Sequence, residues 1–327
     1  MASGKWIPDL TPETATVDAA RRALSLRLEA LREALGAALD SIDDDLEHIH
    51  QLRVACRRAT AAVDLFEVCL PRKTAKKARQ LLRTFRRAAG DARDWDVWLL
   101  QLSKRLRANS ADDLPGIDML FGYCMAHRIP AQECLESICP DYPFEYERWM
   151  TNTLSALQAP EAAFAQRVAD LGPARLIPQF ERFWKSLQQP NLSWTELHDT
   201  RIEAKRLRYG VELLAAALPS GLQEAAYQQL SEVQSILGDA NDGFVALQRL
   251  EELQRRLPEL FRRAWPRWSP FIETLIREQR QQMQGARDRF EHWKQSAEHE
   301  RLDVVFHSLF SGESTSTNGQ YAIVQAS

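Results

Sequence analysis

The 327-residue chain contains 45% hydrophobic and 27% charged residues, a composition typical of a globular protein with an apolar core. Its formal net charge is −3, no apolar run approaches the roughly 18 residues of a membrane span, and the first residues form no apolar signal core, which argues against a membrane or secreted protein. The five cysteines form an odd set without metal-type spacing, so a reducing, cytoplasmic location is expected.

Apolar residues at helical spacing predict an all-α fold with no strand. The expected helices cover residues 17–41, 44–69, 75–107, two segments within 115–157, then 161–188, 194–217, 222–256 and much of 258–310. We expect Thr74 to cap the third helix, Gly90-Asp91 to interrupt it, and Ser193 or Thr195 to cap a later one. Residues 1–16 are expected to be an N-terminal tail, 17–310 one helical domain, and 311–327 a disordered polar tail.

The chain contains an internal repeat without gaps. His198 follows His50 by 148 residues, and at the same offset Arg53 meets Arg201 and Arg57 meets Lys205. The run GDARD at 90–94 likewise meets GDAND at 238–242. A match over some fifty residues predicts two similar halves, at about 17–157 and 161–310, related by a pseudo-twofold axis.

Charge is unevenly distributed along the chain. Residues 50–107 hold fifteen basic and five acidic residues, a local balance of +10. Residues 111–170 hold three basic and ten acidic residues, a balance of −7. Such segregation creates a local electric field that selects charged partners.

On the repeated helices, apolar residues recur at regular spacing along one side, which we call the seam, and basic residues directly follow the seam positions. The seam of the first half runs from Ile49 to Leu70 at spacings of 3 and 4, and that of the second half from Leu197 to Leu218. Because successive residues lie about 100° apart around a helix, the basic rows flank the seams and are expected to be half-buried along a groove. The rows are His50, Arg53, Arg57 and Thr60 in the first half, and His198, Arg201, Lys205 and Arg208 in the second.

The next helix carries a similar row only in the first half. Its members are Lys76, Arg79, Arg83 and Arg86, and the matching positions of the second half are Glu224, Tyr227, Ser231 and Gln234. Acidic residues at i±4 are scarce in the first half, which favours an anion-binding groove. A solvated charged face is the alternative.

The runs HQLRVACRR, GDARDWDV, LHDTRIEAKRLRYGVELL and LGDAND resemble those of the CHAD family, the conserved-histidine α-helical domain. The resemblance implies one domain of two pseudo-symmetric helical bundles around a basic central groove or pore that binds inorganic polyphosphate. It also implies association with polyphosphate or storage granules and their proteins. Thr60 and the neutral stretch at 224–234 depart from the family pattern. The implied binding residues are His50, Arg53, Arg57, Arg58, Lys76, Arg79, Arg83, Arg86, His198, Arg201, Lys205, Arg206 and Arg208.

The chemistry of these residues agrees with that implication. Arginine donates two parallel hydrogen bonds to a phosphate, and converging helices supply a denser ladder of such groups than one helix can. The basic rows contain no aromatic platform for nucleobases, so nucleic acid is the less expected partner. We therefore expect a non-enzymatic polyphosphate-binding protein.

Three other readings are open. A metal site formed by His50 and His198 is disfavoured, because an arginine follows each histidine by one turn and repels a cation. No cofactor is predicted. A phosphohydrolase is disfavoured, since Glu145-Tyr-Glu147-Arg148-Trp149 has the wrong spacing for a triphosphatase and no Walker loop is present. A nucleic-acid-binding or granule scaffold protein would use the same electrostatics.

A group of aspartates could also be mistaken for a metal site. The group comprises Asp91, Asp94, Asp96, Asp239 and Asp242. We expect these residues to be structural, placed at a helix break and clamping buried arginines such as Arg58 and Arg206.

Overall fold

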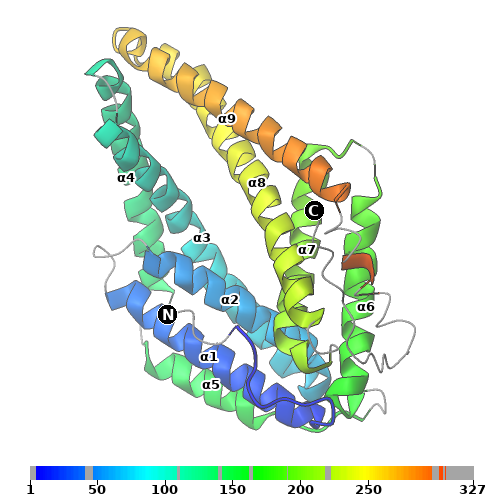
Figure 1. Ribbon diagram of the computed structural model, residues 1–327. Helices are drawn as coiled ribbons and strands as arrows, with labels where there is room; N and C mark the ends of the chain where they lie inside the picture. The colour runs from blue at the N-terminus through cyan, green and yellow to red at the C-terminus, as the bar shows by residue number, and fades with distance from the viewer. Residues whose placement is uncertain are drawn as a thin grey trace.

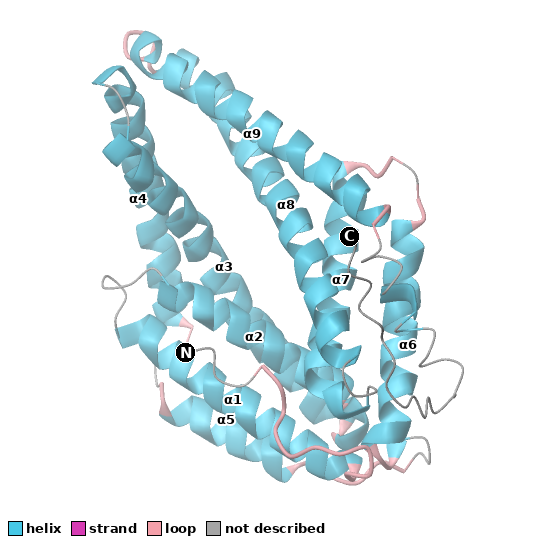
Figure 2. Cartoon of the chain, in the orientation of Figure 1, coloured by secondary structure: helices cyan, strands magenta, loops and turns pink. Residues whose placement is uncertain are grey.

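The computed structural model describes residues 5–40, 47–108, 111–138, 142–161, 165–189, 191–217, 222–296, 302–304 and 306. Long helices dominate these residues (Figure 1), and within them no strand is present apart from one isolated bridge between Ala15 and Arg167 (Figure 2). The predicted all-α class is therefore confirmed. The helices are α1 (Thr16–Asp40), α2 (Glu47–Leu65), α3 (Arg72–Ala108), α4 (Leu114–Ser137), α5 (Phe144–Ser155), α6 (Val168–Leu187), α7 (Trp194–Leu214), α8 (Leu222–Leu260) and α9 (Trp265–Lys294).

Helix α3 differs from the prediction at two points. It runs through Gly90-Asp91 without a break, and it starts at Arg72, so Thr74 lies inside the helix and is not its cap. A glycine costs a helix only about 1 kcal/mol, which the packing of α2 and α4 along α3 outweighs. The continuity of α3 matters because it carries one wall of the site described below.

The N-terminal cap of α7 is the predicted Ser193. Its hydroxyl accepts a hydrogen bond from the backbone N–H of Glu196, and the Glu196 carboxylate accepts one from the backbone N–H of Ser193. This reciprocal capping box satisfies two donors that the helix itself leaves free. It fixes the start of the helix that carries the second basic row.

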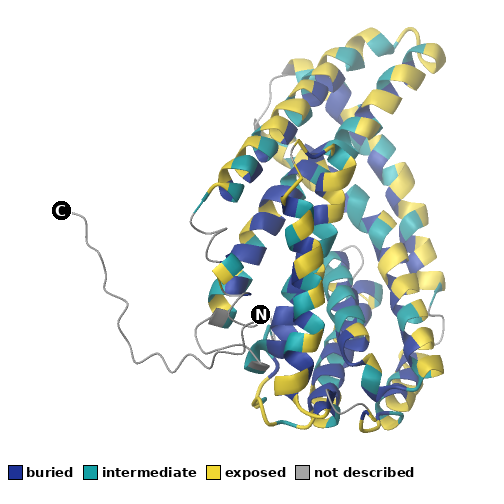
Figure 3. Ribbon diagram, turned by 90° about the vertical axis from the view of Figure 1, so that its right-hand side faces the viewer, coloured by how far each residue is buried: buried dark blue, intermediate teal, exposed yellow. Residues whose placement is uncertain are grey.

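Both predicted seams are buried. Figure 3 shows that many helices have buried residues, in dark blue, and exposed residues, in yellow, on different sides. The seam members from Ile49 to Leu70 and from Leu197 to Leu214 belong to one large core, or pack fully buried beside it, while Leu218 lies outside the described residues. A second, smaller core lies among α3, α4, α8 and α9 and includes Leu102, Leu253 and Phe271. The long helices α3 and α8 thus pass from one core into the other.

The helices pack in the same sequence in both halves. In the first half α1 packs on α2, α2 on α3 and α3 on α4, and in the second half α6 packs on α7, α7 on α8 and α8 on α9. The halves meet where α2 contacts α7 and again where α4 contacts α9. This order is what the repeat predicts, and a pseudo-twofold superposition of the halves stays a prediction.

A close approach between α4 and α9 closes this packing into a ring of helices. A Cβ atom at Gly116 of α4 would lie 2.5 Å from the Cβ atom of Phe271 on α9. Only glycine therefore allows the two helices to come this near. The ring runs in the order α2, α3, α4, α9, α8 and α7, and returns to α2.

The described residues that precede α1 pack against the helices. The Nη2 of Arg27 donates a hydrogen bond to the carbonyl of Lys5 at 2.9 Å, and Ile7 is buried. The Trp6 ring meets the Tyr227 ring of α8 edge-on at 5.3 Å, and the Lys5 ammonium lies 3.6 Å from the centroid of the same tyrosine. We call residues 5–9 the N-terminal strap.

A buried carboxylate joins the two halves where α2 meets α7. Glu212 of α7 is 1% exposed and pairs with Arg58 of α2 at 2.9 Å, with Arg208 one turn away at 3.1 Å, and with Arg27 of α1 at 3.7 Å. Three guanidinium groups thus share one carboxylate in the protein interior.

Among the described residues, no helix is both long and apolar enough to cross a membrane.

Candidate anion-binding cavity

A cavity of about 340 Å³ lies between α2, α3, α7 and α8, with α9 at its edge. Its wall combines basic residues from both halves with two carboxylates, Asp94 and Asp242. The excess of positive charge makes this cavity a candidate site for an anion. The basic residues of the wall are His50, Arg53, Arg57, Arg93, Arg201, Lys205 and Arg249.

The wall is built from equivalent positions of the repeat. Six pairs of lining residues are separated by the same 148 positions that separate the two histidines. The cavity therefore lies where the two copies face each other. The pairs are Arg53 with Arg201, Arg57 with Lys205, Asp94 with Asp242, Val97 with Val245, Trp98 with Ala246, and Gln101 with Arg249.

The two halves place equivalent aspartates beside the equivalent arginines Arg53 and Arg201. Arg53 Nη1 donates to the carbonyl of Gly90 at 3.0 Å and to Asp94 Oδ1 at 3.2 Å. Arg201 Nη2 lies 3.8 Å from Asp242 Oδ1, and its Nε lies 3.9 Å from the place of a Cβ at Gly238. The repeated Gly-Asp-Ala-x-Asp run thus orients an arginine, with the last aspartate as its partner.

Other contacts fix the remaining cations of the wall. Arg57 Nε donates to the hydroxyl of Tyr209 on α7 at 3.2 Å, across the boundary between the halves. Arg249 Nη2 donates to Asp94 Oδ2 at 3.0 Å, and its guanidinium lies 4.6 Å from the centroid of Trp95. These groups are thereby placed before any ligand arrives.

Crowding of like charges makes the cavity electrostatically unfavourable when empty. Burial, together with the charges of the nearby Arg201 and Arg57, lowers the pKa of Lys205 to about 7, and Asp242 opposes this shift only in part. Burial, with Arg57 and other arginines, also lowers the pKa values of Arg53 and Arg201. An anion between these groups would relieve the repulsion and favour their charged forms.

The two predicted histidines have different surroundings. His50 lines the cavity, and burial together with the charge of Arg93 lowers its pKa. His198 is exposed, lies outside the lining, and makes a hydrogen bond of 2.5 Å from Nδ1 to Asn241 Oδ1. At the repeat position of Asn241 the first half has Arg93, so the halves differ at this point.

Three of the predicted arginines on α2 and α7 do not line the cavity. Arg58 and Arg208 instead pair with the buried Glu212 described above. Arg206 is exposed and pairs with Glu203 on the same helix. Each of these residues lies next to a lining residue or one turn from it, so one step around the helix changes its surroundings completely.

The predicted row on α3 also lies outside the cavity. Lys76, Arg83 and Arg86 are exposed, and Arg79 pairs with Asp64 and Glu67. The row faces the outside of the molecule along the first half of α3. Its significance is taken up below.

Four of the five aspartates pair with arginines, although with others than expected and without a helix break. Asp96 pairs with Arg128 at 2.9 Å, and Asp239 with Arg289 at 2.6 Å. Neither Arg58 nor Arg206 is paired with a member of this group. In the described part of the chain, no three His, Cys, Asp or Glu side chains are grouped as a metal site.

Sequence reasoning missed two cations of the wall, Arg93 and Arg249. Arg93 lies within the repeated GDARD run and stands opposite an asparagine in the second copy. Arg249 lies two helical turns beyond Asp242, where the quoted part of the repeat ends. Extending the repeat by two turns pairs Arg249 with Gln101.

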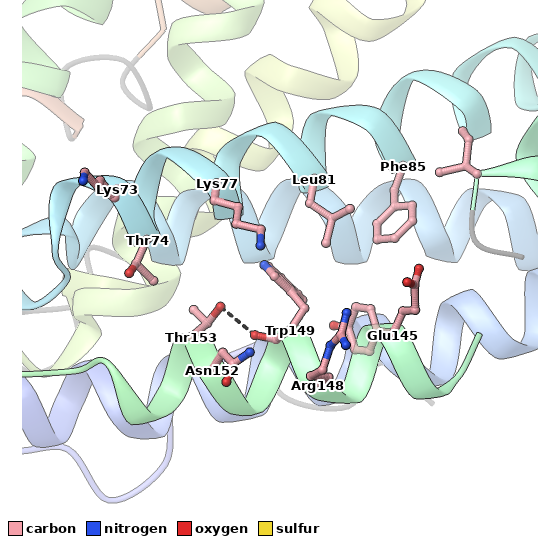
Figure 4. A pocket seen from close by; sticks show the side chains of 12 residues that line it. Lys73, Thr74, Lys77, Leu81, Phe85, Glu145, Arg148, Trp149, Asn152 and Thr153 are labelled. Atoms are coloured by element: carbon pink, nitrogen blue, oxygen red, sulfur yellow. Dashed lines mark hydrogen bonds between the residues drawn. The ribbon is translucent and has the colours of Figure 1, made fainter. Parts of the chain in front are cut away.

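A second hollow, of about 470 Å³, lies on the outside between α3 and α5 (Figure 4). Lys73, Lys77 and Arg148 lie along it with Glu145, over Trp149 and other apolar side chains, and Lys77 points toward Trp149. It holds fewer cations than the central cavity, and only in one half of the repeat. The central cavity is therefore the stronger candidate site.

The sequence model of the CHAD domain family matches residues 22–251 of the chain. The chain belongs to the CHAD family. Its structure is similar to the crystal structure of the CHAD domain from the plant Ricinus communis, with 21% identity, a TM-score of 0.64, and coverage of 93% of this chain and 96% of that one. It is also similar to PptA from Streptomyces chartreusis, with 17% identity, a TM-score of 0.63, and coverage of 86% and 100%. These likenesses establish the CHAD fold, and the chain matches no curated protein.

Proposed function

We propose that the central cavity binds inorganic polyphosphate and does not hydrolyse it. The observation that carries this proposal is the wall itself, in which seven basic side chains converge from both halves around two carboxylates. A linear polyanion supplies several closely spaced charges to such a wall at once. By the same chemistry, we propose that the protein associates with polyphosphate granules in the cytoplasm.

The state of the two carboxylates supports binding over hydrolysis. Asp94 accepts hydrogen bonds from Arg53 and Arg249, and Asp242 lies beside Arg201. A general base has to accept a hydrogen bond from the water molecule that it activates, whereas both carboxylate oxygens of Asp94 already accept one from an arginine. These groups orient arginines and do not activate water.

The aromatic residues near the cavity favour polyphosphate over nucleic acid. The Trp95 ring already stacks on His127 at 4.8 Å and carries the Arg249 guanidinium. Trp98 is 9% exposed and belongs to the second core. Single-stranded nucleic acids gain much of their affinity from stacking bases on free aromatic faces, which these rings do not offer.

A competition titration tests this proposal. Long-chain polyphosphate should displace a labelled polyphosphate at far lower concentration than RNA of equal charge does. Affinity should fall with salt on a log–log slope of roughly 0.7 for each neutralised phosphate. Equal competition by RNA, a flat salt response, or release of orthophosphate during the titration would each contradict the proposal.

The buried lysine predicts a pH dependence of binding. The pKa of Lys205 is about 7 in the free protein, among Arg201, Arg57, Arg53 and Asp242, and a bound polyanion should raise it toward 10.5. Below pH 7 the lysine is already charged, whereas above pH 7 binding must take up a proton. Affinity should therefore fall by up to about tenfold per pH unit between pH 7 and 9.

Lys205→Arg is the matched comparison for this pH dependence. Its guanidinium keeps the charge but does not titrate in this range, so the variant should lose the component of the pH profile due to Lys205. Titration calorimetry in buffers of different ionisation enthalpy would count the protons taken up. Identical proton uptake by the two proteins at pH 8 would show that Lys205 is not at the ligand.

A further inference from the structure

The row of basic residues on the outside of α3 continues a face that begins inside the cavity. Arg93 lines the cavity, and positions 90, 86, 83, 79 and 76 precede it at alternating steps of 3 and 4. Such steps keep residues on one face of a helix. We define the α3 ladder as Lys76, Arg83 and Arg86, the exposed members of this face.

The junction between the cavity and the α3 ladder is itself positively charged. At position 90 the side chain is absent, and Arg53 from α2 reaches the Gly90 carbonyl. Arg57 lies one turn along α2, on the same side of the helix. Burial raises the pKa of the Cys56 thiol, and the charges of Arg57, Arg86 and Arg53 oppose this shift. An arginine of the cavity and one of the ladder therefore lie within electrostatic range of the same thiol.

Acidic groups are few beside the ladder. Between Glu67 and Asp91 the sequence has no acidic residue. Asp64 and Glu67 lie near the row but pair with Arg79, and Glu67 also pairs with Arg175. The side chains of the α3 ladder therefore have few acidic neighbours that would compete with a bound anion for their charge. From residue 93 to residue 76 the helix rises about 25 Å, which extends well beyond the cavity.

The second half has no equivalent path. Its corresponding positions on α8 are Glu224, Tyr227, Ser231 and Gln234. The N-terminal strap covers Tyr227 with Trp6 and Lys5, and Arg208 donates hydrogen bonds to the Tyr227 hydroxyl at 2.7 Å and to Gln234 Oε1 at 2.9 Å. This face is thus engaged within the protein itself, while the ladder of the first half is open.

We propose that the α3 ladder is a second, exterior polyphosphate subsite, along which a chain that fills the cavity continues on the first half only. This inference rests on the proposed function of the cavity. Its consequence is chain-length selectivity, because an oligophosphate that fits in the cavity does not reach the ladder. Long chains gain additional charge pairs that short ones lack.

The test compares tripolyphosphate with long-chain polyphosphate for three proteins. The first is the unmodified chain, and the second carries Lys76→Gln, Arg83→Gln and Arg86→Gln. The third carries Arg262→Gln, Arg263→Gln and Arg267→Gln, which removes the same charge from exposed positions beside the turn between α8 and α9, at the far end of the molecule from the start of α3 (Figure 1). Circular dichroism checks that all three are equally helical.

The ladder variant should bind tripolyphosphate as the unmodified chain does and bind long chains at least tenfold more weakly. Its salt slope for long chains should also fall by about 2, at roughly 0.7 for each lost phosphate contact. The control variant should match the unmodified chain for both ligands. Equal losses of long-chain affinity in the two variants, or no loss in the ladder variant, would overturn the subsite and leave the cavity proposal intact. Failure of the unmodified chain to bind either ligand would overturn both.

Discussion

Glu212→Gln should lower the free energy of unfolding by about 3–5 kcal/mol, the range for breaking a buried ion pair by removing one partner. The substitution keeps the size of the side chain, so the loss reports charge and not packing. It leaves the buried Arg27 and the half-buried Arg58 and Arg208 without their shared carboxylate. Even beside Glu212, burial lowers the pKa of Arg27 to about 10, which shows how unfavourable that environment is for a cation. Urea denaturation followed by circular dichroism measures the effect.

Glu203→Gln is the matched control for this experiment. Glu203 lies on the same helix and pairs with Arg182 and Arg206, both of which are largely exposed. Ion pairs of exposed side chains contribute about 0–1 kcal/mol, so this variant should remain close to the unmodified stability. Adding Arg58→Met to Glu212→Gln should restore part of the loss, since it removes one uncompensated charge. Similar stabilities for Glu203→Gln and Glu212→Gln would refute the role of Glu212 as the link between the halves.

Arg53→Ala combined with Arg201→Ala should weaken polyphosphate binding at least a hundredfold. Two charge-assisted hydrogen bonds contribute roughly 1.5–3 kcal/mol each. The structure adds a second effect, because these arginines also neutralise the lining carboxylates Asp94 and Asp242. Their removal leaves Asp242 facing the ligand without its partner, and Asp94 with Arg249 alone. Repulsion is then added to lost attraction.

Arg206→Ala combined with Arg255→Ala provides the control, with the same residue types and the same change in net charge. Both side chains are exposed and lie outside the cavity, on α7 and α8 respectively. Binding by this pair should stay within about twofold of the unmodified chain, apart from a small general effect at low salt. A loss comparable to that of the cavity pair would place the site elsewhere on the basic surface. Titrations of the two double variants at one fixed salt concentration decide between these outcomes.

Local patterns in the sequence predicted most of the helices, and the repeat predicted which residues meet. Arg53, Arg57, Arg201 and Lys205 line one cavity, because the seams fix which side of each helix is buried and the repeat relates the two helices. Whether each of them binds polyphosphate stays a prediction.

Contacts between residues distant in the sequence were beyond such reasoning. Arg58 meets Glu212 across 154 positions, and no periodicity in either helix indicates that a carboxylate will be buried there. The continuity of α3 through Gly90 was missed for a related reason. A glycine favours a break when the helix is considered alone, and only the packing of neighbouring helices reverses that preference.

The contact between Gly116 and Phe271 has a mechanical consequence. It lies at the end of the helix pairs opposite the contact of α2 with α7, and the rigid helices α3 and α8 connect the two places. The cavity lies between these two contacts, along α3 and α8. A larger side chain at position 116 should therefore push α4 and α9 apart and widen the cavity, although residue 116 does not line it. Natural variation at Gly116 is expected to change the width of the cavity without changing any of the charges that line it.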